Sequence, residues 1–178
     1  SGGLGTYTEK HVPLAIYSKQ ADKTFFVYGG TTDGEKPHLM LMASYYDHKT
    51  GTIPRPTVVI ERDTTIDAHY NPVIFLDRQG FVWVFAPSHG QTNSYIFKSR
   101  RPYSVDDFEQ IAGKEFSYPH PWYFDQSGWV FNFTKYTANE GIIELSSEVS
   151  NSWPLEAFSL TIFPPSNHSS ISITSRPP

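Results

Sequence analysis

The sequence predicts an all-β protein built from four-stranded antiparallel units, the blades of a β-propeller. A frame of apolar run, polar turn and second apolar run recurs around the prolines at 13, 72 and 121, which lie 59 and 49 residues apart. Further strand-like runs follow each frame, and no segment keeps a helical hydrophobic period over ten residues or more. Four-stranded units repeating at about 50 residues are typical of propeller blades.

The strands can be assigned in chain order from β-branched and aromatic runs bounded by polar turns. The first unit pairs 13–18 with 23–29 across a polar turn, and the apolar run 38–46 follows. The second unit has the runs 72–77, 81–86 and 94–99, with the turn Asp-Arg-Gln-Gly between the first two. The third has 121–125, 129–135 and 141–146, with the turn Asp-Gln-Ser-Gly.

Each unit also has a candidate outer strand, at 57–61, 108–111 and 157–160. Residues 104–108 offer an alternative, one helical turn with Ser104 as its cap and acidic residues in its first turn. We therefore divide this single domain into blades of about 7–62, 67–112 and 116–162. The tail, 163–178, either begins a further blade or is disordered.

Three blades form an incomplete ring, because a propeller needs at least four. The apolar faces of the end blades would then be exposed, and patches of that size are rare on soluble monomers. We expect either a homo-oligomer or the missing remainder of the propeller to cover them.

Composition narrows the function classes. The 178 residues include no cysteine, so neither a disulfide framework nor a thiolate metal site is available. A net charge of −4 with 18% charged residues argues against a nucleic-acid partner, and apolar runs no longer than a strand predict no membrane span. The aromatic content of 16% suits sheet packing and also contact with sugar rings.

The hairpin of the second unit carries a histidine at the open end of each arm. His69 and His89 each lie ten residues from the turn midpoint at Gln79. Residues placed symmetrically about a hairpin turn face each other, with backbones about 5 Å apart. The spacing therefore predicts two adjacent imidazoles at one sheet edge, although two unrelated surface histidines would have the same spacing.

The same frame places further groups on this rim. The position three residues before the framing proline is Lys10, His69 or Tyr118 in the three units, and the mirror position of Tyr118 across its turn is Lys135. Neighbouring blades present their hairpin ends on the same side, so His69, His89, Tyr118 and Lys135 should converge near the channel mouth. Two histidines alone do not fix a metal site, and we predict no metal and no cofactor.

Five segments resemble BNR-repeat proteins, in particular the branch that contains ulvan lyases and rhamnosidase-like propellers: 23–30, 45–51, 55–57, 97–104 and 118–122. The resemblance extends over roughly residues 4–146, and full members of the branch have seven blades. The complete Asp-box of sialidase repeats is missing, and only the Asp77/Gly80 and Asp125/Gly128 turns remain. Sialidase activity is therefore not implied.

The resemblance implies a secreted or periplasmic protein that acts on an acidic, uronic-acid-containing polysaccharide by β-elimination. In that branch the chemistry uses a histidine pair, a tyrosine and an arginine. His69 and His89 match the pair, with Asn71 in the same motif, and Tyr118 matches the tyrosine. Lys135 stands where the branch usually has arginine, which would weaken the grip on a carboxylate. Arg100 and Trp122 are further candidates for substrate binding.

The chemistry of β-elimination requires a base, an acid for the leaving oxygen and a positive charge on the carboxylate. We assign Tyr118 or His69 as base, His89 as acid or carboxylate ligand, and Lys135 as the neutralising cation. A glycosidase at the same rim, a non-catalytic glycan-binding propeller and an inactive piece of a larger protein remain alternatives. Trp83 and Trp122 are expected in the core. Packing or surface roles are expected for the four other histidines: His11, His38, His48 and His120.

Overall fold

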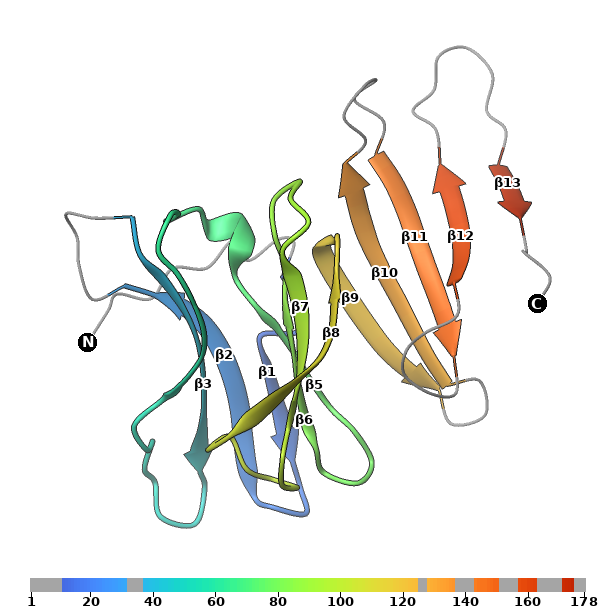
Figure 1. The fold of residues 1–178 in the computed structure, drawn as a ribbon. Coiled ribbons are helices and arrows are strands. Elements are labelled where there is room, and N and C mark those ends of the chain that lie inside the picture. The colour runs from blue at the N-terminus through green and yellow to red at the C-terminus, as the bar shows by residue number, and fades with distance from the viewer. Residues whose placement is uncertain are drawn as a thin grey trace.

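A computed structural model of the chain describes residues 11–31, 37–124, 128–136, 143–150, 157–162 and 171–174. These residues contain thirteen strands and one short 3-10 helix, η1 (Ala68–Tyr70). The strands form three antiparallel sheets, which follow one another across the molecule in chain order (Figure 1). The predicted fold class, antiparallel propeller blades in a ring that is not closed, is confirmed.

The first sheet has the order β1 (Ala15–Ser18), β2 (Lys23–Gly30), β3 (Leu39–Asp47) and β4 (Thr57–Arg62). The second has the order β5 (Val73–Leu76), β6 (Val82–Ala86), β7 (Ser94–Ser99) and β8 (Phe108–Lys114). The third contains β9 (Ser117–Phe124), β10 (Gly128–Tyr136), β11 (Ile143–Ser150), β12 (Ala157–Ile162) and β13 (Ile171–Thr174). Every strand predicted from the sequence is present, with ends that shift by a few residues.

The alternative of a helical turn at 104–108 is wrong. The backbone N–H of Asp106 donates to the Ser104 hydroxyl, and the backbone N–H of Arg100 donates to the Asp107 carbonyl at 3.1 Å. Phe108 then pairs with Ser99 at the start of β8. The segment forms the turn of the β7–β8 hairpin because strand pairing satisfies these backbone groups, which a single isolated helical turn does poorly.

The described part of the predicted tail, 171–174, forms β13, which pairs with β12. It therefore extends the third sheet to five strands. In the part of the chain that the structure describes, no helix is long and apolar enough to cross a membrane.

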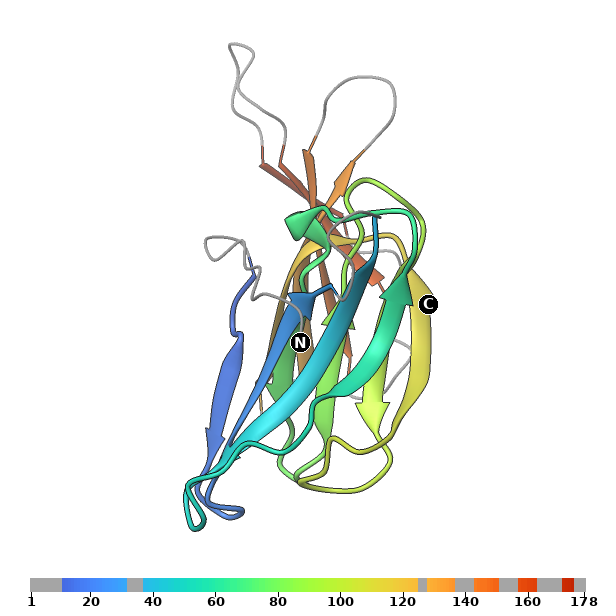
Figure 2. The ribbon, with the colours of Figure 1, turned by 90° about the vertical axis from the view of Figure 1, so that its left-hand side faces the viewer.

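The second sheet is buried on both faces, which explains the unbroken apolar sequence of β6. Val82, Val84 and Ala86 pack toward the first sheet, in a cluster with Phe25 and Leu41. The alternate residues of β6 pack toward the third sheet: Trp83 and Phe85, with Phe116 and Phe131. Figure 2 shows this layering, with the first sheet in front of the other two. Side chains alternate along a strand, so both faces of the middle sheet require apolar residues.

The β5–β6 hairpin has the symmetric register that the histidine spacing predicts. Val73 pairs with Phe85 and Leu76 with Val82, so the pairs are centred on Gln79. At the turn, the Asp77 carboxylate accepts hydrogen bonds from the Phe81 backbone N–H and the Trp83 indole, both at 2.8 Å. Trp83 is buried, as expected.

Gly80 fixes this turn, because its φ of +88° is unfavourable for other residues, and an added Cβ would lie 2.4 Å from the Tyr103 ring. We expect Gly80→Ala to lower the free energy of unfolding by roughly 2–4 kcal/mol. The control is Gly113→Ala, whose Cβ would meet its nearest neighbour at 3.5 Å. Urea titration should show little change for Gly113→Ala. Equal destabilisation by both substitutions would contradict this account of the turn.

Candidate functional site

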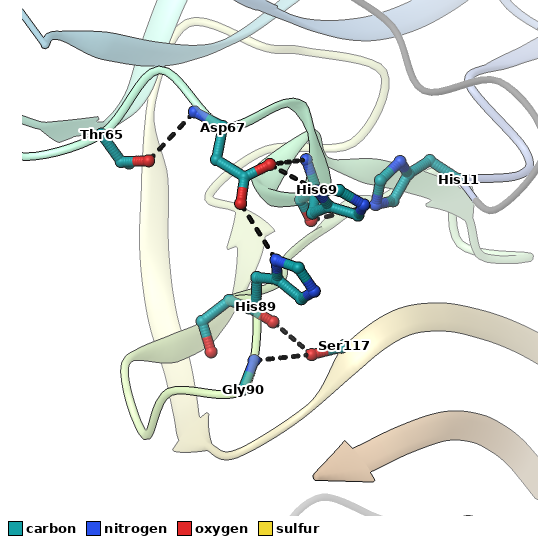
Figure 3. Close-up of polar contacts among 8 residues, drawn as sticks. His11, Thr65, Asp67, His69, His89, Gly90 and Ser117 are labelled. Atoms are coloured by element: carbon teal, nitrogen blue, oxygen red, sulfur yellow. Dashed lines mark hydrogen bonds and ion pairs between the residues drawn. The ribbon is translucent and has the colours of Figure 1, made fainter. Parts of the chain in front are cut away.

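The two histidines at the open end of the hairpin lie side by side, as their spacing predicts. The imidazole centroids of His69 and His89 are 4.1 Å apart, and the ring planes are inclined by 20°. A single carboxylate, that of Asp67, holds both rings (Figure 3). Its Oδ1 lies 2.5 Å from His69 Nδ1, and its Oδ2 lies 3.0 Å from His89 Nδ1.

The local fold of Asp67 follows from a preference of aspartate for the position before a helix. The residue is the N-cap of η1, and its Oδ1 accepts a hydrogen bond from the backbone N–H of His69 at 2.9 Å. The hydroxyl of Thr65 accepts a hydrogen bond from the backbone N–H of Asp67 at 3.0 Å. One short turn thus orients the carboxylate and its first imidazole together.

His89 is positioned by buried serines that connect the second and third sheets. Ser94 Oγ lies 2.6 Å from Ser88 Oγ and donates to the Phe116 carbonyl at 2.7 Å. The Ser117 hydroxyl donates to the Ser88 carbonyl and accepts from the backbone N–H of Gly90 (Figure 3). The loop that carries His89 is therefore attached to the start of β9.

Tyr118 reaches the histidines from the third sheet. Its ring centroid is 5.8 Å from that of His69, at an interplanar angle of 70°, and 6.3 Å from that of His89. Its backbone has a φ of +51°, which is rare for a residue with a bulky side chain. Strained backbone of this kind concentrates at functional sites, where the surrounding structure maintains it.

The strain coincides with a β-bulge that the sequence argument missed. His120 pairs with Asn132, but Ser117 pairs with Thr134, so Tyr118 and Pro119 both lie opposite Phe133. The predicted pairing of Tyr118 with Lys135 is wrong for two reasons. The hairpin is centred on residue 126, since Phe124 pairs with Gly128, and not on the assumed midpoint of 126.5, and the extra residue in β9 then shifts the pairing further. The backbone of Lys135 still lies at this sheet edge, one residue beyond Thr134, whereas its side chain is outside the described residues.

His11 also belongs to the site, although only a packing or surface role was expected for it. It is fully buried, its Nε2 lies 3.1 Å from the backbone carbonyl oxygen of His69, and its ring centroid is 5.8 Å from that of Tyr118. Asp67 was missed as well. An aspartate two residues before a histidine was the available signal, because that spacing allows the capping hydrogen bond seen here.

The shared carboxylate determines the hydrogen positions of the pair. Burial alone would raise the pKa of the Asp67 carboxyl, but hydrogen bonds from the His69 backbone and from both imidazoles outweigh this effect and lower the pKa. An ionised carboxylate only accepts hydrogen bonds, so each imidazole must present Nδ1–H to it. In the neutral imidazoles, Nε2 then carries the lone pair that can accept a proton or bind a substrate group.

Asp67, His69 and His89 could in principle hold a metal ion, as could His38, Glu61 and Asp63. The first group has the wrong orientation for chelation through Nδ1. Imidazole lone pairs lie in the ring plane, and the planes of two stacked rings at 20° do not converge on one ion. In the second group, the distances from His38 Nε2 to the two carboxylates are those of ion pairs, 3.5 and 3.6 Å, and both acids are exposed.

The three proposed substrate-binding residues have different surroundings. Asn71 is only 1% exposed, and its side chain packs against Gly29. Arg100 comes directly after the last residue of β7, at the other end of the strand from Ser94. There it forms ion pairs with Asp107 and Glu109. Asn71 is therefore an interior residue, and Arg100 takes part in surface ion pairs.

Trp122 lies on β9 and is 44% exposed, so its expected place in the core is wrong. Its ring stacks on that of His120, with centroids 5.9 Å apart and planes inclined by 14°. Burial lowers the pKa of His120, which favours the neutral imidazole in this stack. The outer face of the third sheet therefore presents a flat aromatic surface.

No protein-family model and no curated protein matches this sequence. Among solved structures, the chain is similar to a polysaccharide lyase, an ulvan lyase bound to -[GlcA(1-4)Rha3S]-, with a TM-score of 0.70 and 16% identity. A second ulvan lyase structure gives a TM-score of 0.69 and 17% identity. The matches cover 90% of this chain but only 40% and 39% of the lyase chains, so the chain spans about two fifths of their length. The likeness establishes the fold, whereas the BNR-repeat relation stays a prediction.

The lowered pKa of Asp67 makes the site sensitive to acid. Its contribution to stability is present above the ordinary carboxyl pKa of 3.8 and is lost as the pH falls through the lower, folded-state value. We expect Asp67→Asn to be less stable than the wild type at neutral pH, and this difference to shrink below about pH 4. Urea unfolding between acidic and neutral pH measures it, with the exposed Asp107→Asn as control. A difference that does not depend on pH would contradict the assignment.

Proposed function

We propose that this chain is the catalytic part of a carbohydrate-active propeller that cleaves uronic-acid-containing polysaccharide by β-elimination. The observation that carries the proposal is the pair of stacked imidazoles on one carboxylate, with a strained tyrosine against them at the junction of the second and third sheets. Acid–base residues that converge from separate elements on one sheet edge are typical of an active site. Structural likeness to polysaccharide lyases supports the same reaction class.

The reaction needs one proton removed and one proton delivered. The base takes the proton from the carbon next to the uronate carboxylate, and the electron pair left behind forms a carbon–carbon double bond. The bond to the glycosidic oxygen then breaks, and an acid protonates that oxygen as it leaves. Tyr118 or His69 acts as base, and His89, carrying a second proton on Nε2, acts as the acid or donates a hydrogen bond to the carboxylate.

The shared carboxylate of Asp67 has two roles in this scheme. It fixes both imidazoles as Nδ1–H tautomers, so that Nε2 is the reactive nitrogen in each ring. It also stabilises a proton taken up by either ring, because a carboxylate next to an imidazole favours the charged form. The pair can therefore accept a proton in one step and return it in the next.

Neutralisation of the substrate carboxylate is assigned to Lys135, whose backbone lies at this edge beside the start of β9. A lysine supplies a point charge in place of the planar fork of an arginine, so it grips a carboxylate less firmly.

A second candidate function is glycan binding without cleavage. The exposed Trp122, stacked on His120, supports it, because flat aromatic surfaces favour the apolar faces of sugar rings. In that case the polysaccharide would bind along β9, and loss of Trp122 would weaken binding more than loss of either His69 or His89.

Removal of the proposed acid–base groups provides the direct test. With an uronic-acid polysaccharide as substrate, His69→Ala and Tyr118→Phe should each reduce turnover by roughly 10²–10⁴-fold, the usual contribution of a positioned acid or base. Ultraviolet absorbance of the unsaturated uronate product measures the rate. His48→Ala, at the exposed end of the first sheet, is the matched control and should keep full activity. If the wild type binds the polysaccharide without forming product, the lyase proposal is wrong and the glycan-binding function remains.

Lys135→Arg tests the neutralising cation. Restoring the bidentate fork should tighten contact with the carboxylate and raise kcat/KM by about 10-fold, the effect of one improved charge-assisted hydrogen bond. Lys135→Met should abolish turnover, because the positive charge is lost. Wild-type kinetics in both variants would show that this residue does not contact the substrate.

A further inference from the structure

Arg62 is a buried cation next to the candidate site. It is the last residue of β4 and is 7% exposed. Burial is the main cause that lowers the pKa of its guanidinium, and two tyrosines, Tyr70 and Tyr95, oppose that effect. A cation in this position loses much of its hydration, so the contacts that it makes in return have a structural purpose.

The contacts of this guanidinium are with carbonyl oxygens and aromatic faces. Its Nη2 lies 3.1 Å from the Pro87 carbonyl oxygen, 3.1 Å from that of Asn93 and 3.5 Å from that of Ala86. Its central carbon lies 4.8 Å from the ring centroid of Tyr70 and 5.8 Å from that of Tyr95. A planar guanidinium can lie over an aromatic ring and also donate hydrogen bonds from its N–H groups, so both kinds of contact suit arginine.

The partners of Arg62 belong to the two segments that carry the imidazoles. Pro87 and Asn93 lie at the two ends of the loop that contains His89. Tyr70 directly follows His69 in η1. One side chain of the first sheet therefore contacts both segments that carry the histidine pair.

We propose that Arg62 is a positioning residue that sets the separation of His69 and His89. It stacks on the η1 segment and bridges the ends of the 87–93 loop, so the two imidazoles reach the same carboxylate. Its effect on turnover rests on the proposed function above, but its effect on the geometry of the pair does not.

Lysine cannot replace this arrangement, because its ammonium group lacks the planar face that the guanidinium places over the Tyr70 ring. An apolar side chain would fill the space without the cost of burying a charge, so it should preserve the fold. Arg62→Met therefore separates positioning from general stability. Arg101→Met is the matched control, because Arg101 is exposed near the far end of β7 and pairs with Asp106.

The test uses the full 178-residue chain. Nitrogen-15 NMR of the imidazoles should detect two protected Nδ1–H groups and contacts between the His69 and His89 ring protons in the wild type and in Arg101→Met. Both signals should disappear in Arg62→Met while its unfolding remains cooperative. On uronic-acid polysaccharide, kcat should fall by about 10- to 100-fold with KM nearly unchanged, as expected for misplaced catalytic groups.

Retention of the paired-imidazole signals in folded Arg62→Met would overturn the proposal. If Arg62→Met does not fold, Arg62→Lys decides: loss of the ring contacts supports positioning by the guanidinium, and wild-type signals overturn it. A wild type that shows the imidazole signals but no lyase activity, together with their loss in Arg62→Met, would support positioning while rejecting the proposed function.

Discussion

Burial of the second sheet on both faces is the constraint on which the rest of the structure depends. β6 contributes alternate residues to two separate clusters, one shared with the first sheet and one with the third. A shift of one residue in its register would exchange those two sets, so the register is strongly fixed. The same register places His69 and His89 across from each other, and the geometry of the site is therefore a consequence of the core.

The site forms where elements that are distant in the sequence end at one edge. Asp67 and His69 come from the segment between the first two sheets, His89 from the β6–β7 loop and Tyr118 from the third sheet. The serine network ties His89 to the start of β9, and Arg62 ties it to the first sheet. Strands supply rigid anchors, and the functional groups lie on the short segments at their ends.

The electrostatics of the site combine a shared anion, Asp67, with a buried cation, Arg62. The lowered pKa of Asp67 keeps one negative charge between two imidazoles, which can then hold a proton without leaving an unpaired charge. Arg62 places a positive charge against the two segments that carry the imidazoles.

The sequence by itself determined the strands, the antiparallel blades and the proximity of the two histidines, because all three depend on local alternation and on symmetry about a turn. It failed where an irregularity or a distant contact decides. The β9–β10 hairpin is centred half a residue away from the midpoint assumed for Lys135, and the bulge at Tyr118 and Pro119 shifts the pairing further. A bulge adds a residue without changing the hydrophobic pattern, so the sequence did not reveal it.

Only the tertiary structure brought His11 and Arg62 to the pair, because His11 is 58 residues from His69 along the chain and Arg62 is 25 residues from Pro87. It also moved Asn71 into the interior and Trp122 to the surface, since which face of a strand is covered depends on the neighbouring sheet. Local pattern fixes which residues alternate, and packing between sheets decides which of them meet.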